Sequence, residues 1–389
     1  MKLFDVYPLY DVTPVSAKGI EVWDDKGQKY WDFYGGHAVI SIGHTHPHYV
    51  KRIKDQLDKI AFYSNSIQNP IQEALAEKLG QLSGCEEYEL FMCNSGAEAN
   101  ENALKMASFH TGKSKVIAFN NSFHGRTSAA VAATDNPGIN APINRQQAVT
   151  FLPLNDFDAF EKAIASDEYC AVILEAIQGV GGLDEPTTEF YQFIAEKCKA
   201  QNVVLIADEV QSGYGRSGKF FAFQHHLDTE RLPAGQAGSR SVQPDIISIA
   251  KGMGNGFPVG GVLIHETFKP SYGLLGTTFG GNHLACAASL AVLEVLESEG
   301  LTQNAAKLGT YFREKAQEIP EIKNVKGRGL MIGLEFDFEV ADLRKKLIYD
   351  QHIFTGSAKN KKLLRFLPAL NITKEHVDLF FEALQNALK

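Results

Sequence analysis

The chain has 389 residues, of which 44% are hydrophobic, and it carries a formal net charge of −8. This length allows a substantial core and two domains, and the acidic balance argues against a protein that holds nucleic acid or an anionic membrane through a basic field. The five cysteines are scattered without a C-x-x-C pair, no apolar run is long enough to cross a bilayer, and the first residues (MKLFDVYPLYDV) lack the apolar run of a signal peptide. We therefore expect a cytoplasmic protein that acts on small molecules.

The first motif along the chain is GHTHPH, which places His44, His46 and His48 at alternating positions. Histidine is a common metal ligand, but the alternating spacing and Pro47 favour a turn, and no cysteine or acidic cluster accompanies them. We expect no metal site.

Short apolar, β-branched segments alternate with helical patterns farther along the chain, which predicts an α/β fold with a mostly parallel central sheet. The strand candidates are residues 115–120, 171–176, 203–208 and 245–250. Apolar residues recur at helical spacing in 189–200 and 377–388, and a long helix that begins near Asn282 is expected to join the sheet to a smaller domain. We predict a large domain over residues 45–285 and a small α+β domain made of residues 1–44 and 286–389.

Chemically useful side chains follow the predicted strands. In an open parallel sheet, ligands bind at the carboxyl ends of the strands. Asp208 ends one strand candidate and Lys251 follows another. The turn at Ser95 and Gly96 opens a helix whose free N–H groups suit a phosphate, although Ser95 is as readily an ordinary N-cap. A lysine for covalent attachment, an acid against a pyridinium nitrogen and a phosphate cup describe a pyridoxal-phosphate site.

The chain contains, in order, NSGAEANENALKMA, FHGRT, ILEAIQG, ADEVQSGYGRSG, IAKGMGNGFPVGG and TTFGGNHLAC. These motifs resemble the class III aminotransferases, and within that class the acetylornithine and ornithine aminotransferases. The resemblance runs from about Tyr10 to about Leu367. It implies a fold-type I pyridoxal-phosphate-dependent transferase that works as a homodimer with shared active sites. The implied reaction moves the terminal amino group of N-acetylornithine, or of another N-acylornithine, to 2-oxoglutarate in arginine biosynthesis.

The resemblance implies that Lys251 holds the cofactor and then serves as a general base, while Asp208 faces the ring nitrogen. It further implies that the cofactor phosphate is held by Ser95, Gly96 and Ala97 of one subunit and by Thr278 of the other. Phe123 would stack on the cofactor ring, and Gln211 would hydrogen-bond its phenolic oxygen.

Two arginines are expected to bind substrate carboxylates, because a guanidinium fork can bind a carboxylate bidentately. The resemblance assigns Arg126 to the distal carboxylate and Arg365 to the α-carboxylate of glutamate. It also implies that Tyr10 contacts a substrate carboxylate and that Glu175 lies near the site. His37 is expected to help select the acyl group.

The sequence departs from the family pattern at Val180, where the family usually has a glutamate that pairs with the arginine matching Arg365. Either Arg365 stays available for substrate, or another acid takes the missing place. The segment RLPAGQAGSRSVQP (231–244) is also longer than the usual connection, and we expect an exposed loop away from the chemistry.

Other donors remain open at this point. Succinylornithine, ornithine or 4-aminobutyrate aminotransferases would use the same cofactor residues. A non-catalytic pyridoxal-phosphate-binding regulatory module is a more remote alternative, because this chain keeps Lys251 and the two arginines and shows no basic helix-turn-helix segment.

Overall fold

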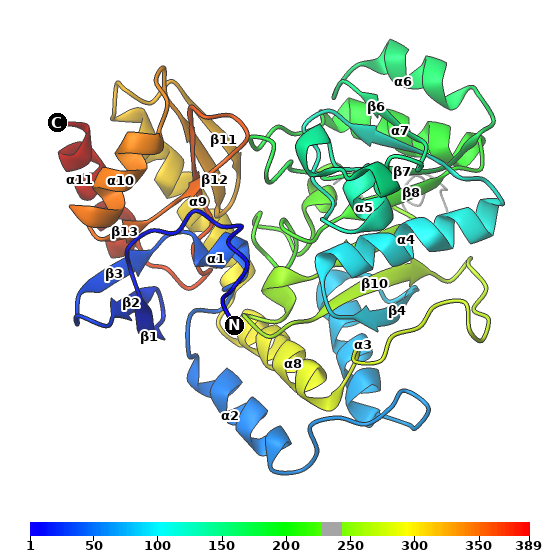
Figure 1. Cartoon of the computed structure of the whole chain (residues 1–389), viewed down its shortest axis with the longest axis horizontal. Helices are drawn as coiled ribbons and strands as arrows, with labels where there is room; N and C mark the ends of the chain where they lie inside the picture. The colour runs from blue at the N-terminus through cyan, green and yellow to red at the C-terminus, as the bar shows by residue number, and fades with distance from the viewer. Residues whose placement is uncertain (228–242) are drawn as a thin grey trace, which may run out of the picture.

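The computed structural model describes residues 1–227 and 243–389. A seven-stranded sheet lies at the centre of its larger part (Figure 1). Its strands, in spatial order, are β4 (Tyr88–Cys93), β10 (Gly260–His265), β9 (Ile246–Ile249), β8 (Val204–Asp208), β7 (Tyr169–Leu174), β5 (Lys115–Phe119) and β6 (Val149–Leu152). β10 runs antiparallel to both of its neighbours, β4 and β9, and the other adjacent strands pair in parallel. The prediction of an α/β fold with a mostly parallel sheet is therefore confirmed.

The inner strands are apolar because helices cover both faces of the sheet. Every residue of β7, β8 and β9 is buried, as expected for parallel strands without a solvent-facing side. The helix predicted at 189–200 is α7 (Thr188–Ala200), and it buries Phe190, Ile194 and Cys198. Thr187 starts this helix by accepting the N–H of Phe190 at 3.1 Å.

The remaining helices connect or cover the sheets. They are α1 (Gly35–Ala38), α2 (Pro47–Leu57), α3 (Pro70–Ser83), α4 (Gly96–Thr111), α5 (Ser128–Ala132), α6 (Phe157–Ile164), α8 (His283–Ser298), α9 (Leu301–Gln317), α10 (Ala341–Tyr349) and α11 (Lys374–Leu388), with the 3₁₀ helices η1 (Pro137–Ile139), η2 (Pro142–Asn144), η3 (Ala222–His225) and η4 (Lys251–Met253). The helix expected from Asn282 is α8, because Asn282 Oδ1 accepts the N–H of Ala285 at 2.9 Å. It packs against α2, α3 and α9.

Two four-stranded sheets make up the smaller part of the molecule. The first has the order β1 (Pro14–Lys18), β2 (Glu21–Asp24), β3 (Lys29–Asp32), β13 (Ile353–Phe354), and the second β11 (Asn324–Arg328), β12 (Met331–Glu335), β15 (Leu363–Phe366), β14 (Gly356–Ser357). Because β3 pairs in parallel with β13, the N-terminal segment and the C-terminal half share a sheet. The division into residues 45–285 and the two flanking segments stays a prediction, and its second boundary falls inside α8.

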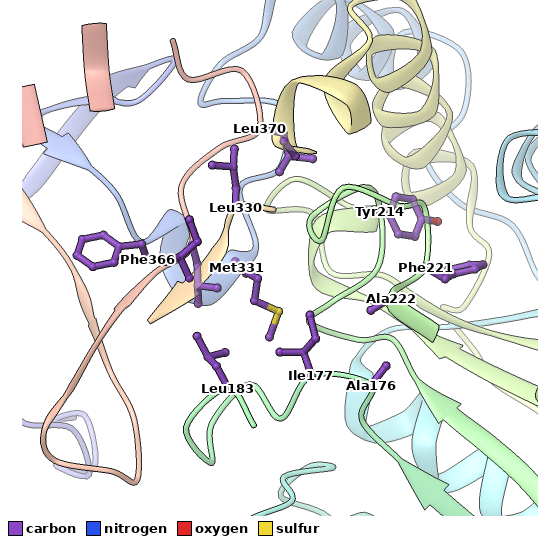
Figure 2. Close-up of a cluster of buried hydrophobic side chains, with 14 of the residues drawn as sticks. Ala176, Ile177, Leu183, Tyr214, Phe221, Ala222, Leu330, Met331, Phe366 and Leu370 are labelled. Atoms are coloured by element: carbon purple, nitrogen blue, oxygen red, sulfur yellow. The ribbon is translucent and has the colours of Figure 1, made fainter. Parts of the chain in front are cut away.

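A buried apolar cluster joins β12 to the loop that follows β7 (Figure 2). Met331 of β12 lies beside Leu183 and Ile177, and all three are at most 2% exposed. This packing places β15, the neighbour of β12, next to the carboxyl edge of the central sheet. Removal of such side chains from water is the main favourable term that holds the two parts together.

The three histidines of GHTHPH do not line the active-site cavity described below. His44, His46 and His48 contact three different carboxylates, those of Asp32, Glu299 and Glu294. Within residues 1–227 and 243–389, no helix is both long and apolar enough to span a membrane. Of the expected loop 231–244, only Gln243 and Pro244 lie within the described residues.

Candidate active site

A cavity of about 360 Å³ opens at the carboxyl ends of the parallel strands. The sequence-predicted residues that line it are Ser95, Gly96, Ala97, Phe123, Arg126, Glu175, Asp208, Gln211 and Lys251. Apolar side chains, among them Val39, Val180 and Val210, complete the wall. The fold therefore brings together side chains from segments more than 150 residues apart.

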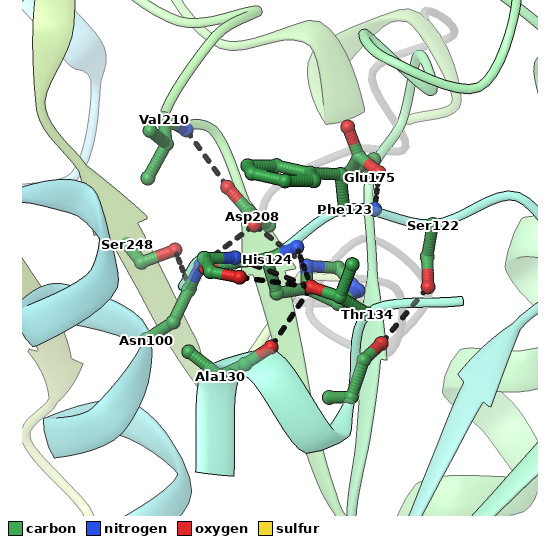
Figure 3. Close-up of polar contacts among 12 residues, drawn as sticks. Asn100, Ser122, Phe123, His124, Ala130, Thr134, Glu175, Asp208, Val210 and Ser248 are labelled. Carbon is green, nitrogen blue, oxygen red and sulfur yellow. Dashed lines mark hydrogen bonds and ion pairs between the residues drawn. The ribbon is translucent and has the colours of Figure 1, made fainter. Parts of the chain in front are cut away.

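Asp208, the last residue of β8, is 4% exposed and is fixed by three hydrogen bonds (Figure 3). Its Oδ2 accepts from Asn100 Nδ2 at 2.8 Å and contacts His124 Nδ1 at 2.7 Å, and its Oδ1 accepts the N–H of Val210 at 3.0 Å. Charge-assisted hydrogen bonds of this kind hold a carboxylate in one orientation. A negative charge is thus fixed at the cavity wall.

Asn100 and His124 connect Asp208 to the rest of the site. Asn100 also donates to the carbonyl of His124 at 2.7 Å and accepts from Ser248 Oγ at 2.6 Å. The His124 side chain is fully buried, and its Nε2 has no partner among the described residues. Both residues lie in motifs seen in the sequence, but only the fold reveals that they hold Asp208.

Glu175 lines the same cavity as Lys251 and fixes two backbone N–H groups there. Its two carboxylate oxygens accept the N–H groups of Phe123 and Gly179, each at 2.9 Å. Burial raises the pKa of Glu175 to about 7, while the nearby His124 opposes that rise. The first of these bonds holds the backbone of Phe123, whose ring lies with Val210 near Asp208 (Figure 3).

Lys251 stands at the end of β9 in an unusual backbone conformation, with φ of 47°. A non-glycine residue in the left-handed region is strained and tends to occur where function requires it. Burial lowers the pKa of Lys251, and the charges of Asp208 and Glu175 oppose that effect. A lowered pKa increases the fraction of neutral amine, which is the nucleophilic form.

The N-terminus of α4 forms one end of the cavity. Ser95 is the N-cap, and its Oγ accepts the N–H of Glu98 at 3.2 Å. The N–H groups of Gly96 and Ala97 have no acceptor in the described part of the chain, as is usual for the first turn of a helix. At Gly96 a Cβ would come within 2.5 Å of Val210, so the close approach of this turn to the sheet requires glycine.

Arg365 of β15 lies behind the cavity wall and is 4% exposed. Its Nη1 donates to the carbonyl of Gly179 and, at 3.2 Å, to Gln211 Oε1. Its Nε donates to the carbonyl of Ser357 at 2.7 Å, and its Nη2 to the hydroxyl of Tyr34 at 3.1 Å. All four acceptors are neutral. In the part of the chain that the structure describes, no acid forms an ion pair with Arg365, and Glu175 acts on its charge only from a distance.

Besides Arg365, three of the predicted residues do not line the cavity. Tyr10 packs edge-on against Tyr349, with ring centroids 6.3 Å apart. Thr278 is exposed in the single chain. His37 lies beside Tyr34, where partial burial and then the charges of Arg365 and Lys251 lower its pKa.

Comparison with known proteins identifies the family. The family model described as aminotransferase class-III matches residues 6–388. The chain is 39% identical to the acetylornithine aminotransferase of Methanocaldococcus jannaschii, over 97% of this chain and 94% of that protein, and 39% identical to that of Bacillus subtilis, over 99% and 97%. A solved structure of the ornithine aminotransferase of Toxoplasma gondii is similar to this chain with a TM-score of 0.85 and 29% sequence identity, over 97% of this chain and 90% of that one. That structure has pyridoxal phosphate at partial occupancy in its active site. The chain therefore belongs to the class-III aminotransferases, which depend on pyridoxal phosphate.

Proposed function

We propose that this chain transfers the terminal amino group of N-acetylornithine, or of another N-acylornithine, to 2-oxoglutarate, giving an N-acylglutamate 5-semialdehyde and glutamate. The observation that carries this proposal is the full-length similarity to several acetylornithine aminotransferases at 36–39% identity. The reverse direction is a step of arginine biosynthesis.

The cavity residues fit pyridoxal phosphate. The free N–H groups of Gly96 and Ala97 suit the phosphate, and the fixed carboxylate of Asp208 suits a protonated ring nitrogen. Phe123 and Val210 offer apolar surfaces for the two faces of a flat ring. When bound, the cofactor supplies an electron-withdrawing ring and an aldehyde carbon that can take up and return an amino group.

The remaining chemical roles belong to side chains that line the cavity. Lys251 Nζ would hold the cofactor covalently, and its neutral amine would accept and return the proton at the substrate carbon that bears the amino group. Asp208 favours the protonated form of the ring nitrogen by its charge. Arg126, which lines the cavity and makes no ion pair within the described ranges, binds the distal carboxylate. The apolar wall excludes water from the reacting carbon.

We further propose a homodimer with shared active sites, in which Thr278 of one subunit reaches the phosphate held by the other. The exposure of Thr278 in the single chain supports this, as does a group of exposed apolar side chains that includes Phe62, Tyr63 and Phe279. Phe62 and Phe279 pack together with ring centroids 5.5 Å apart. Exposed apolar clusters of this kind mark interaction surfaces.

Burial of all five free cysteines supports a reducing compartment, and we propose the cytoplasm.

A panel of amino donors tests the proposed substrate. Steady-state rates would be measured with N-acetylornithine, N-succinylornithine, ornithine and 4-aminobutyrate, each with 2-oxoglutarate. We expect the highest kcat/KM for an acylated ornithine. A clear preference for ornithine or 4-aminobutyrate would replace the proposed donor with a related one, because all of these reactions use the same cofactor residues.

A second experiment separates an enzyme from a non-catalytic binding module. Purified protein incubated with pyridoxal phosphate should show the visible absorbance of bound cofactor and should change colour with a donor. The variant Lys251→Ala should lose both the covalently retained cofactor and turnover. Equal turnover by this variant would overturn the assignment of Lys251.

A further inference from the structure

Arg365 is a buried cation that no acid among the described residues contacts directly, although the buried carboxyl group of Glu175 is near enough to interact with its charge. It is 4% exposed, and it forms no ion pair with any acid in residues 1–227 and 243–389. Burial lowers the pKa of Arg365, while Tyr34 is the first of the groups that oppose this. Desolvating an unpaired charge is costly, and an arriving carboxylate would offset that cost.

The hydrogen bonds leave one donor of Arg365 unused. A guanidinium has five N–H groups, one on Nε and two on each terminal nitrogen. Ser357, Gly179 and Gln211 take the single N–H of Nε and both of Nη1. Tyr34 takes one of the two on Nη2. The second N–H of Nη2 has no acceptor in the described part of the chain.

The hydroxyl of Tyr34 has a spare donor beside this free N–H. Its oxygen accepts from Arg365 Nη2 at 3.1 Å, so its own proton points elsewhere, and no described residue accepts it. Two donors of neighbouring groups, one N–H and one O–H, therefore stand next to each other. A carboxylate has two oxygens and can accept both.

The backbone holds Tyr34 in this position. Its ring crosses β14 at Gly356, where a Cβ would come within 2.1 Å of the ring, and Gly356 is the residue paired with Arg365 in the sheet. The N–H of Tyr34 donates to Asp32 Oδ1 at 2.9 Å. Tyr34 directly precedes α1, and Val39, one residue beyond α1, lines the cavity. Neither Tyr34 nor Arg365 lines the cavity itself, but Gln211, which does, accepts from Arg365 Nη1 at 3.2 Å, so the two donors lie one side chain behind the cavity wall.

We infer that the hydroxyl of Tyr34 and the free N–H of Arg365 form one receptor for a carboxylate, which makes Tyr34 a specificity-determining residue for the five-carbon dicarboxylates 2-oxoglutarate and glutamate. The inference rests on the proposed function for the identity of these acids. It explains how Arg365 keeps its orientation without an acid at position 180: neutral acceptors hold it, and nothing charged has to leave before substrate binds.

The variant Tyr34→Phe removes the O–H and keeps the ring over Gly356. The cofactor-loaded protein would be titrated with glutarate, a five-carbon dicarboxylate that can neither donate nor accept an amino group. Loss of one hydrogen bond to a carboxylate should weaken glutarate binding about 5- to 30-fold. The KM for 2-oxoglutarate should rise by a similar factor, while the KM for the amino donor stays within about twofold.

Two further variants accompany Tyr34→Phe, one that displaces the same hydroxyl and one that serves as a control. Gly356→Ala keeps the hydroxyl but forces the ring of Tyr34 to move, so it should weaken glutarate in the same way. Tyr311→Phe is the matched control, because its hydroxyl contacts Asp378 on the surface between α9 and α11. Unchanged glutarate affinity in Tyr34→Phe, or equal rises in KM for both substrates, would overturn the inference. Glutarate binding is measured without turnover, so this outcome is distinct from a different donor in the substrate panel.

Discussion

Replacing Asp208 with asparagine tests the central electrostatic claim about the cavity. The substitution removes the charge and turns one oxygen into an NH2 group. The remaining oxygen can still accept from Asn100 and His124, and the new NH2 then faces the N–H of Val210 at 3.0 Å. Leaving this partly buried N–H without an acceptor should lower the free energy of unfolding by about 1 kcal/mol.

The expected loss of activity is larger than the loss of stability. An opposite charge within about 4–6 Å shifts the pKa of an ionisable group by roughly 1–3 units. If the protonated ring is the form that reacts, kcat should fall about 10- to 1,000-fold. The measurements are steady-state kcat for the acylornithine reaction and urea unfolding of the cofactor-loaded protein.

A matched variant separates charge from burial. Asp245 lies beside the opposite end of the same sheet and accepts the N–H of Leu205 at 2.8 Å. Asp245→Asn should also lose stability but should keep kcat within about twofold. The reasoning would be refuted if Asp208→Asn bound the cofactor and still turned over within about threefold of the wild type.

Three further predictions concern pH, substrate balance and the core. Because burial raises the pKa of Glu175 to about 7, the folded protein holds a proton that the unfolded chain releases near pH 4.5, and the free energy of unfolding should fall as the pH rises from 4.5 to 7. Urea unfolding should show a smaller fall for Glu175→Gln than for the wild type. Equal falls would contradict the assignment. Val180→Glu should place a carboxylate near Arg365 that competes with the substrate carboxylate. The KM for 2-oxoglutarate should therefore rise about tenfold relative to the uncharged control Val180→Gln, and identical steady-state kinetics of the two variants would contradict this competition. Phe312→Ala should lower the free energy of unfolding by about 3–5 kcal/mol, since this buried ring packs against three other phenylalanines; a loss below about 1 kcal/mol in urea unfolding would contradict that packing.

The parts of the fold that sequence could predict are those with a local signal. The strands β5, β7, β8 and β9 are β-branched apolar runs, and the helices α7 and α11 have clear apolar faces. Because parallel strands share one carboxyl edge, the same reasoning placed Lys251 and Asp208 in one cavity. The antiparallel β10 carried no such local signal, since direction depends on pairing with distant strands.

The parts that sequence could not predict depend on backbone groups or on contacts between distant segments. The partners of Arg365 include the carbonyls of Gly179 and Ser357, which any residue type would offer. Asn100 reaches Asp208 across 108 positions, and nothing in either motif encodes that contact. The sequence around Tyr34 carries no signal for its role, because a tyrosine after a phenylalanine is typical of a core and the hydroxyl contact depends on the distant Gly356.

The pairing of β3 with β13 has a consequence for how this chain is made. Trp31 meets its neighbour Ile353 only after more than 300 further residues have been added. At ribosomal rates of about 5–20 residues per second, the outer edge of β3 waits on the order of 15–60 s for its partner. During that time its N–H and C=O groups can template pairing with other chains. The newly synthesised protein is therefore most vulnerable to aggregation at its leading end, and any truncation before Ile353 would make that state permanent.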